Sequence, residues 1–301
     1  MAIVWRTLLA ASRRDVVAWH IGFAALFLLI AVSLGVLLSS NKGTGFLGRA
    51  LLPVLAAHAV LMIGGWLSLT LAGVAPKLVA MFTLTEDLLD HHLLRAQLGL
   101  LSSGIGGLAV VWGWELPDGL ALVMLVLIAG GAGCLLWQLV TLYRHRRRRL
   151  FDVHAPFMKG ALLFGVVGLL VMLANIGKPP GSPGWIVAGW LFLAGWLGTA
   201  VQGFFYKVVS FLLWLHRYAP IAGQQPTPRL EDLYHPHLAM AGFALWMVGI
   251  ATTTLGLALG NPEWTRLATF PVTAGGLFWL GNILLIILPH RSEQIPVPWP
   301  K

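Results

Sequence analysis

The sequence predicts an all-α, polytopic transmembrane helix bundle of about eight spans, arranged as two parallel four-helix repeats. Three observations predict this fold. Hydrophobic residues make up 58% of the 301 residues and charged residues only 10%, which is too little charge to cover the surface of a soluble domain. Eight apolar runs are long enough to cross a bilayer. Several short motifs also recur at a fixed offset along the chain.

Each of the eight runs holds about 20 mostly apolar residues, the length that a helix needs to cross the hydrocarbon core. The second and sixth runs are the longest, and we expect them to tilt or to extend past the interface. Pro76 should bend the end of the second. The predicted spans are 17–38, 50–76, 92–113, 119–142, 157–177, 184–213, 237–259 and 267–289.

Two segments flank the spans. Residues 1–15 place apolar side chains such as Trp5 against Arg6 and Arg13, a pattern typical of an interfacial helix. Residues 291–301 form a predicted C-terminal tail. The one cysteine, Cys134, lies within an apolar run, which excludes a disulfide framework and a thiolate metal cluster.

The basic residues predict the orientation of the chain in a membrane. The net charge is +9, but the lysines and arginines lie between apolar runs, so we expect membrane lipids and no nucleic acid as partners. With eight spans, all of them fall on one side except Lys42, Arg49, Lys178 and Arg266. The positive-inside rule then places both termini in the cytoplasm. Arg144 and Arg146 to Arg149 are interpreted as a topology anchor that also meets anionic lipid.

An internal repeat is the most informative pattern. Gly65-Trp66-Leu67 recurs as Gly195-Trp196-Leu197, and the same offset relates Gly73 to Gly203 and Lys77 to Lys207. Further along, His92-Leu93 recurs as His237-Leu238, after a longer loop in the second copy. The repeat divides the chain into units 16–150 and 151–290. An even number of spans in each gives both units the same orientation.

The acidic residues narrow the possible functions. All eleven Asp and Glu fall in predicted loops or at span ends, whereas proton relays and cation pathways usually need acids within the membrane. This argues against a carboxylate-driven transporter. No paired carboxylates, Ser-His-Asp set, phosphate loop or nucleotide fingerprint is visible.

Histidine is the remaining candidate ligand. Only His58 lies well inside a span near the predicted outer face, where an imidazole needs a partner. It is either an axial haem or copper ligand or a histidine hydrogen-bonded to a nearby carbonyl. Met62, one turn further on, and Met172 are candidate second ligands. The alternative metal ligands are four histidines toward the cytoplasmic side, His20, His92, His216 and His237.

Lys77 and Lys207 are interpreted as two cations that lean toward the interior near the cytoplasmic end. Snorkelling to the interface is the simpler explanation. The alternative is binding of an anionic group, such as a haem propionate or a lipid phosphate.

Two segments resemble a known group of proteins. Residues 58–70, running on to 77–82, and residues 205–218, followed by 232–234, resemble short bacterial membrane proteins that are similar to subunit I of haem–copper oxidases and, distantly, to NnrS-type proteins. The resemblance implies a reduced oxidase-like bundle in a bacterial inner membrane, with His58 as a ligand of haem b. Val60 stands where that group often has a second histidine, and no histidine pair lies within a span, so copper is the weaker expectation.

Two functional hypotheses follow. The first is a haem-binding or redox-linked membrane protein, acting as a subunit of a respiratory or nitric-oxide-related electron-transfer complex with other subunits or a cytochrome as partners. The second is a cofactor-free structural or assembly subunit that keeps the oxidase-like fold. An absorption spectrum of the purified protein separates them.

Overall fold

The structure is a computed structural model that describes residues 6, 10, 15–147, 153–179 and 181–288. Within these residues it is helical, with no strand, and eight helices are long and apolar enough to cross a membrane. The prediction of eight apolar spans is therefore confirmed. The predicted helix 1–15 and tail 291–301 lie almost wholly outside the described residues. The spans are Val16–Thr44, Gly48–Thr83, His91–Gly113, Asp118–Arg144, His154–Ala174, Pro183–Arg217, Pro236–Ala258 and Pro262–Ile287.

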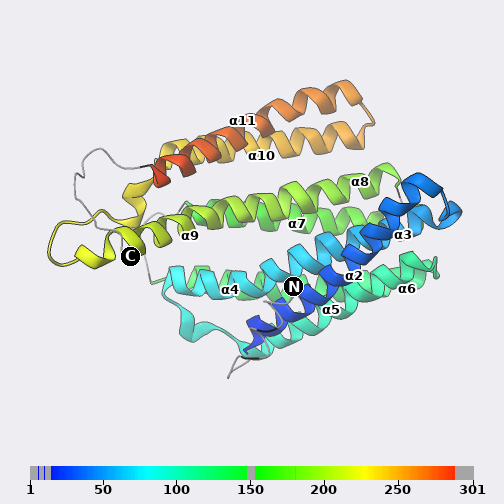
Figure 1. The fold of residues 1–301 in the computed structure, drawn as a ribbon, viewed down its shortest axis with the longest axis horizontal. Helices are drawn as coiled ribbons and strands as arrows, with labels where there is room; N and C mark the ends of the chain where they lie inside the picture. The colour runs from blue at the N-terminus through cyan, green and yellow to red at the C-terminus, as the bar shows by residue number, and fades with distance from the viewer. Residues whose placement is uncertain (1–5, 7–9, 11–14, 148–152, 180, 289–301) are drawn as a thin grey trace. The chain divides into compact units, whose positions relative to one another are not determined.

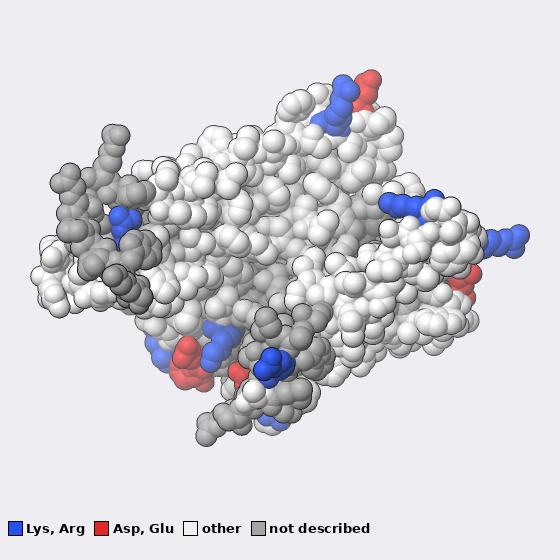
Figure 2. Space-filling view, in the orientation of Figure 1, with Lys and Arg blue, Asp and Glu red and all other residues white. Residues whose placement is uncertain are grey.

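Polar residues mark the ends of the helices. Asp15 caps α2 (Val16–Thr44) by accepting a hydrogen bond from the Ala18 amide at 2.9 Å, and Asp90 and Asn261 cap α5 (His91–Gly113) and α11 (Pro262–Ile287) in the same way. Such caps satisfy amides that have no partner within the helix. On the face drawn in Figure 2, the charged side chains lie at the helix ends and the flanks between them are free of charge, as a lipid-facing surface requires.

The second span contains a π-helical stretch and a proline. It consists of α3 (Leu51–Ala59), η2 (Val60–Ser68, π-helical) and α4 (Leu69–Thr83). The helix continues past Pro76 to Thr83, beyond the apolar run 50–76. Pro76 has no amide hydrogen and leaves the Ala72 carbonyl without an intrahelical donor. The side chain of Gln97 takes that place, with its Nε2 donating to Ala72 O at 2.9 Å.

The sixth span has the same construction. It consists of α8 (Pro183–Trp190), η4 (Leu191–Gly198, π-helical) and α9 (Thr199–Arg217). Both π-helical stretches contain the recurring Gly-Trp-Leu motif. Long π-helical runs are rare and often occur at functional positions, so their recurrence at the same motif is a specific likeness between the two spans.

The chain divides into two compact units. Unit 1 comprises 1–150 and 167–189, and unit 2 comprises 151–166 and 190–301. Unit 1 therefore contains α2 to α5, α6 (Asp118–Arg144), the last part of α7 (His154–Ala174) and nearly all of α8. Unit 2 contains the first part of α7 (His154–Ala174), α9, α10 (Pro236–Ala258) and α11.

Glycines bring the helices of each unit into close contact. In unit 1, a Cβ on Gly65 would lie 2.7 Å from Phe27 Cβ, and one on Gly73 would lie 2.6 Å from His20 Cγ. In unit 2, a Cβ on Gly195 or on Gly203 would lie 2.6 Å from the Cβ of Phe164 or Phe157 respectively. These distances leave no room for a methyl group. The two recurring glycines thus make the same kind of contact in each unit.

A buried carboxamide anchors the start of the third helix in each unit. In unit 1, Gln138 of α6 accepts from the Asp90 amide at 3.0 Å and donates to Leu88 O at 3.1 Å. In unit 2, Asn282 of α11 accepts from the His235 amide and donates to His235 O, both at 3.0 Å. Asp90 and His235 are the N-cap residues of α5 and α10. We call these two arrangements the amide clamps.

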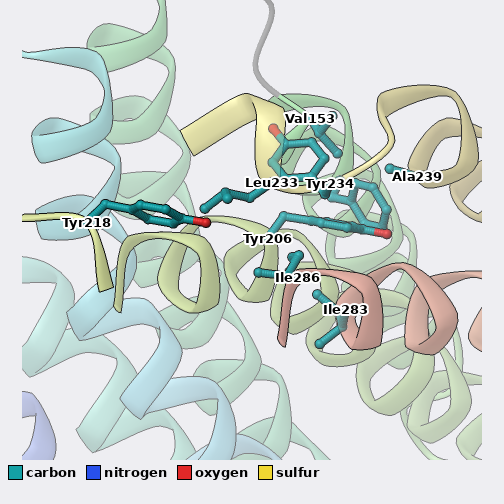
Figure 3. Packing of buried hydrophobic residues seen from close by; sticks show 9 residues of the cluster. Val153, Tyr206, Tyr218, Leu233, Tyr234, Ala239, Ile283 and Ile286 are labelled. Carbon is teal, nitrogen blue, oxygen red and sulfur yellow. The ribbon is translucent and has the colours of Figure 1, made fainter. Parts of the chain in front are cut away.

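Unit 2 also contains an aromatic core at the end of α9. Figure 3 shows Tyr206 and Tyr234 beside each other, with their ring planes tilted by 50° and their ring centroids 5.3 Å apart. Tyr206 also receives a hydrogen bond from Asn282 Nδ2 at 3.4 Å. The other buried members of the cluster are Val153, Phe157, Tyr218, Leu233, Ala239, Ile283 and Ile286.

Arg147 has a more specific role than a topology anchor requires. It donates to Asp87 Oδ2 at 2.7 Å and to the Leu84 carbonyl at 3.2 Å, and its amide donates to Thr83 O at 3.0 Å. It thereby ties the loop that follows the second span to the end of the fourth. The Arg147 guanidinium lowers the pKa of Asp87 below its ordinary value.

Replacing Arg147 by glutamine should raise the pKa of Asp87 toward its ordinary value, because the guanidinium no longer donates to the carboxylate. In the unchanged protein the contact is present at neutral pH and is lost as the pH falls through the lowered pKa. Carbon-13 NMR of aspartate carboxyls measures this titration. Asp90, whose pKa is lowered by the Leu93 and His92 amides, and Arg146→Gln serve as controls. An unchanged Asp87 titration in the Arg147 variant would contradict the assignment.

Candidate functional site

His58, near the end of α3, is held in one orientation. Its Nδ1 lies 2.8 Å from the carbonyl oxygen of Ala31 in α2. Because a carbonyl only accepts, Nδ1 carries the hydrogen and the neutral ring presents Nε2 as its lone-pair nitrogen. Histidine ligands of metals commonly have this arrangement, with one ring nitrogen bonded to a carbonyl and the other free to coordinate. The same bond also satisfies a purely structural histidine.

Small residues on α2 make room for the His58 ring. A Cβ on Gly35 would lie 3.1 Å from His58 Cε1, the ring carbon between the two nitrogens. Ala31, one turn before Gly35, is fully buried and supplies the carbonyl. A larger residue at position 35 would press on the ring at Cε1, on the side of Nδ1. We call Ala31, Gly35 and His58 the histidine seat.

The candidate methionine ligands have different surroundings in the structure. Met62 is half-buried and lies one turn beyond His58, within η2. Met172 packs against a cluster formed by Leu108, Val111, Ala121 and Leu125. Met124 packs against the same cluster, with its sulfur against the backbone of Gly107. Met62 lies four residues beyond His58, and Met172 packs within this cluster.

The four other candidate histidines have different surroundings. His92, His216 and His237 are exposed, whereas His20 is fully buried and bonds to Val16 O and to Gln97. Across the described ranges, no group of three or more His, Cys, Asp or Glu side chains is placed to hold a metal ion. The chain thus offers single histidines rather than a multi-histidine centre in this part of the molecule.

The two lysines are not alike. Lys77 is exposed, so the prediction that it leans toward the interior is wrong, and its long stem allows the ammonium to stay at the surface. Lys207 is buried, with 3% of its surface exposed. It lies on the inward face of α9 beside the buried Tyr206 and Ser210.

Sequence reasoning missed the pair formed by His20 and Gln97. Gln97 is a fully buried carboxamide inside an apolar helix, and an uncharged side chain leaves no charge signal in an apolar run. Pro76 was the available signal. A proline within a span frees a carbonyl, and a buried glutamine on a neighbouring span is a suitable donor.

Comparison with known proteins does not extend these observations. No protein-family model, no curated protein and no solved structure matches this chain. What can be said of its function therefore depends on the histidine seat and on the polar residues within the spans.

Proposed function

We propose that this chain is an integral membrane protein that binds haem b through His58 and acts in a redox-linked role, as a membrane subunit of a respiratory or nitric-oxide-related complex. The observation that carries the proposal is the His58 ring, whose Nδ1 is bonded to Ala31 O at 2.8 Å and whose Nε2 is thereby presented for coordination. Met62 is the candidate second ligand. A bound haem would supply one-electron transfer at its iron.

The proposal includes the architecture. The recurring glycine contacts, the two π-helical stretches and the two amide clamps support an origin of the chain as two parallel four-helix copies, in the manner of a reduced oxidase-like bundle. The basic residues between spans support an inner membrane location with cytoplasmic termini. In this arrangement Ala188 stands where the first copy has His58, so the haem site belongs to the first copy alone.

The second candidate function is a cofactor-free structural or assembly subunit. One observation favours it. The Ala31 carbonyl already accepts the one N–H hydrogen of the neutral His58 ring, so the histidine seat joins α2 and α3 without needing a bound cofactor. Small residues and buried polar bonds of this kind commonly hold membrane helices together.

An absorption spectrum of protein purified from haem-replete cells decides between the two functions. The first predicts a Soret band that His58→Ala abolishes and that Gly35→Ala shifts, since the added methyl group presses on the ring. His145→Ala is the matched control, because His145 also bonds a carbonyl through Nδ1 at 2.9 Å but is exposed. If the purified protein shows no Soret band, the structural or assembly function is the one that remains. A band unaffected by His58→Ala would remove His58 as the ligand.

A further inference from the structure

The hairpin of α2 and α3 continues past the end of α5. A Cβ on Gly113, the last residue of α5, would lie 3.4 Å from Ala57 Cβ, and the neighbouring His58 packs against Gly35 of α2. The end of α5 is therefore level with Gly35 and Ala57. Beyond this level α2 continues for nine residues to Thr44 (44 − 35 = 9), which is about 13 Å of helix.

Residues 36–56, which we call the arm, contain a well-defined turn at one end of unit 1 (Figure 1). Asn41 Oδ1 accepts a hydrogen bond from the Leu47 amide at 2.7 Å, and Asn41 O accepts one from the Gly45 amide at the same distance. Gly45 ends α2 with a φ of 65°, a left-handed conformation that favours glycine. Asn41 and Pro53 are the buried residues of the arm, so these bonds shape the turn while most of its side chains face outward.

The second four-helix copy has no comparable arm. The recurring contacts between glycine and phenylalanine align α7 with α2 at an offset of 137 (164 − 27 = 137), so Met172 is the counterpart of Gly35. The α7 helix ends at Ala174, two residues after Met172 (174 − 172 = 2), and α8 begins at Pro183. The packing of a four-helix copy therefore does not require an arm.

Tryptophan side chains mark the level at which the arm begins. Trp112 of α5 and Trp185 of α8 pack edge to face, with ring centroids 4.5 Å apart, and the exposed Trp114 follows the end of α5. Indole rings gather at the headgroup level of a bilayer. A headgroup layer is about 5–8 Å deep on each side, so about 13 Å of helix is long enough to cross this layer or to lean on it.

The surface of the arm is apolar and basic. Phe46 and Leu52 are 55% and 50% exposed. Lys42 and Arg49 are exposed as well, and residues 16–85 contain no Asp or Glu. Within the part of the chain that the structure describes, neither cation pairs with an acid. Exposed apolar side chains combined with basic residues are typical of segments that lie in the headgroup layer.

We propose that the arm docks on anionic phospholipid headgroups of the surrounding membrane. Lys42 and Arg49 contact lipid phosphates, and Phe46 and Leu52 insert among the headgroups. Lipid is the occupant because the bilayer reaches the base of the arm, and the charge of the arm favours anionic lipid since basic residues are attracted to an anionic surface. The acids at this end of unit 1 lie at the connection between α5 and α6, outside the arm.

The test follows the surroundings of Phe46 in lipid vesicles. Phe46→Cys, combined with Cys134→Ala, is labelled with the environment-sensitive dye NBD and reconstituted into phosphatidylcholine vesicles with or without phosphatidylglycerol. We expect blue-shifted emission and quenching by lipid that is spin-labelled at the headgroup, both stronger with phosphatidylglycerol. Lys42→Gln and Arg49→Gln should each lower the ratio of docked to undocked arm by about fivefold, which corresponds to ~1 kcal/mol per basic residue near an anionic surface.

Two controls separate docking from a general effect of lipid charge. Lys178→Gln should leave the signal unchanged, because Lys178 is an exposed cation between α7 and α8, outside the arm. The same label at Val126, exposed on α6, should be blue-shifted in both kinds of vesicle. Emission at Phe46 that is red-shifted, quenched by iodide and equal in both vesicles would overturn the proposal and leave a protein as the occupant. Equal effects of Lys42→Gln and Lys178→Gln would also contradict it.

A second measurement uses the unchanged protein. Hydroxyl-radical footprinting in nanodiscs should oxidise Phe46 and Leu52 less with phosphatidylglycerol than with phosphatidylcholine alone. The difference should shrink as salt is added, because salt screens the attraction between charges. Trp264, exposed at the start of α11, is the reference whose oxidation should not change. Equal oxidation of Phe46 in the two lipids would contradict the proposal. Neither measurement depends on haem, so its outcome is separate from that of the absorption spectrum.

Discussion

Replacing Gly73 by alanine should destabilise the protein by about 1–3 kcal/mol, the usual cost of forcing extra atoms into a packed contact. The new Cβ would lie 2.6 Å from His20 Cγ, so α2 and α4 must move apart or His20 must turn. Turning His20 would break its bond to Gln97. The effect is measured by thermal unfolding in detergent.

Gly99→Ala is the matched control for this change. Gly99 is also a helical glycine, in α5, but nothing lies within 4 Å of a Cβ at that position. Alanine is the better helix former by about 1 kcal/mol, so this variant should be as stable as the unchanged protein or slightly more stable. If Gly73→Ala and Gly99→Ala unfold at the same temperature, the close contact between α2 and α4 is not as described.

Replacing Asn282 by leucine should remove the amide clamp of unit 2. The His235 amide loses its partner at the start of α10, and the His235 carbonyl keeps only its bond from the Ala239 amide. Leaving one backbone amide without a partner costs at most about 1–3 kcal/mol, and Tyr206 loses its bond to Asn282 as well. Gln138→Leu should have a related effect at Asp90 in unit 1. Hydrogen exchange of the first turns of α10 and α5 reports each effect locally.

Gln225→Leu is the control for the clamp variants, because it makes the same change of chemistry at an exposed residue between α9 and α10. It should leave hydrogen exchange in both helices unchanged. Fast exchange at the start of α10 in Asn282→Leu, with α5 unaffected, would show that each clamp acts within its own unit. Unchanged exchange in both clamp variants would contradict their anchoring role.

Much of the fold could be predicted from composition and spacing. The eight spans follow from the length of the apolar runs, because lipid requires each backbone polar group to be satisfied within its own helix. The acids that the structure describes lie at helix ends or in loops, as expected, since a bare carboxylate is costly in lipid. Gly65 and Gly73 stood out only as members of the repeat with Gly195 and Gly203, and their role as close contacts came from the structure.

The candidate site was less predictable. The sequence singles out His58 as the histidine inside a span. It does not predict the bond to Ala31, because that bond joins residues of two different helices that are 27 positions apart in the chain. The difference between Lys77 and Lys207 also could not be read from their matching positions. A lysine stem of four carbons can reach the surface or remain inside, and only the neighbouring helices determine which.

By itself, the sequence determined the helical class and the number of spans. These depend on local properties: apolar length and the absence of acids within spans. Only the tertiary structure decided where glycines bring helices together and how the buried polar atoms are paired. Pro76 frees a carbonyl on one helix, Gln97 reaches it from another and His20 completes the pair from a third. The energy of an unpaired polar atom in a low-dielectric interior makes such pairings specific, and they exist only once the helices are assembled.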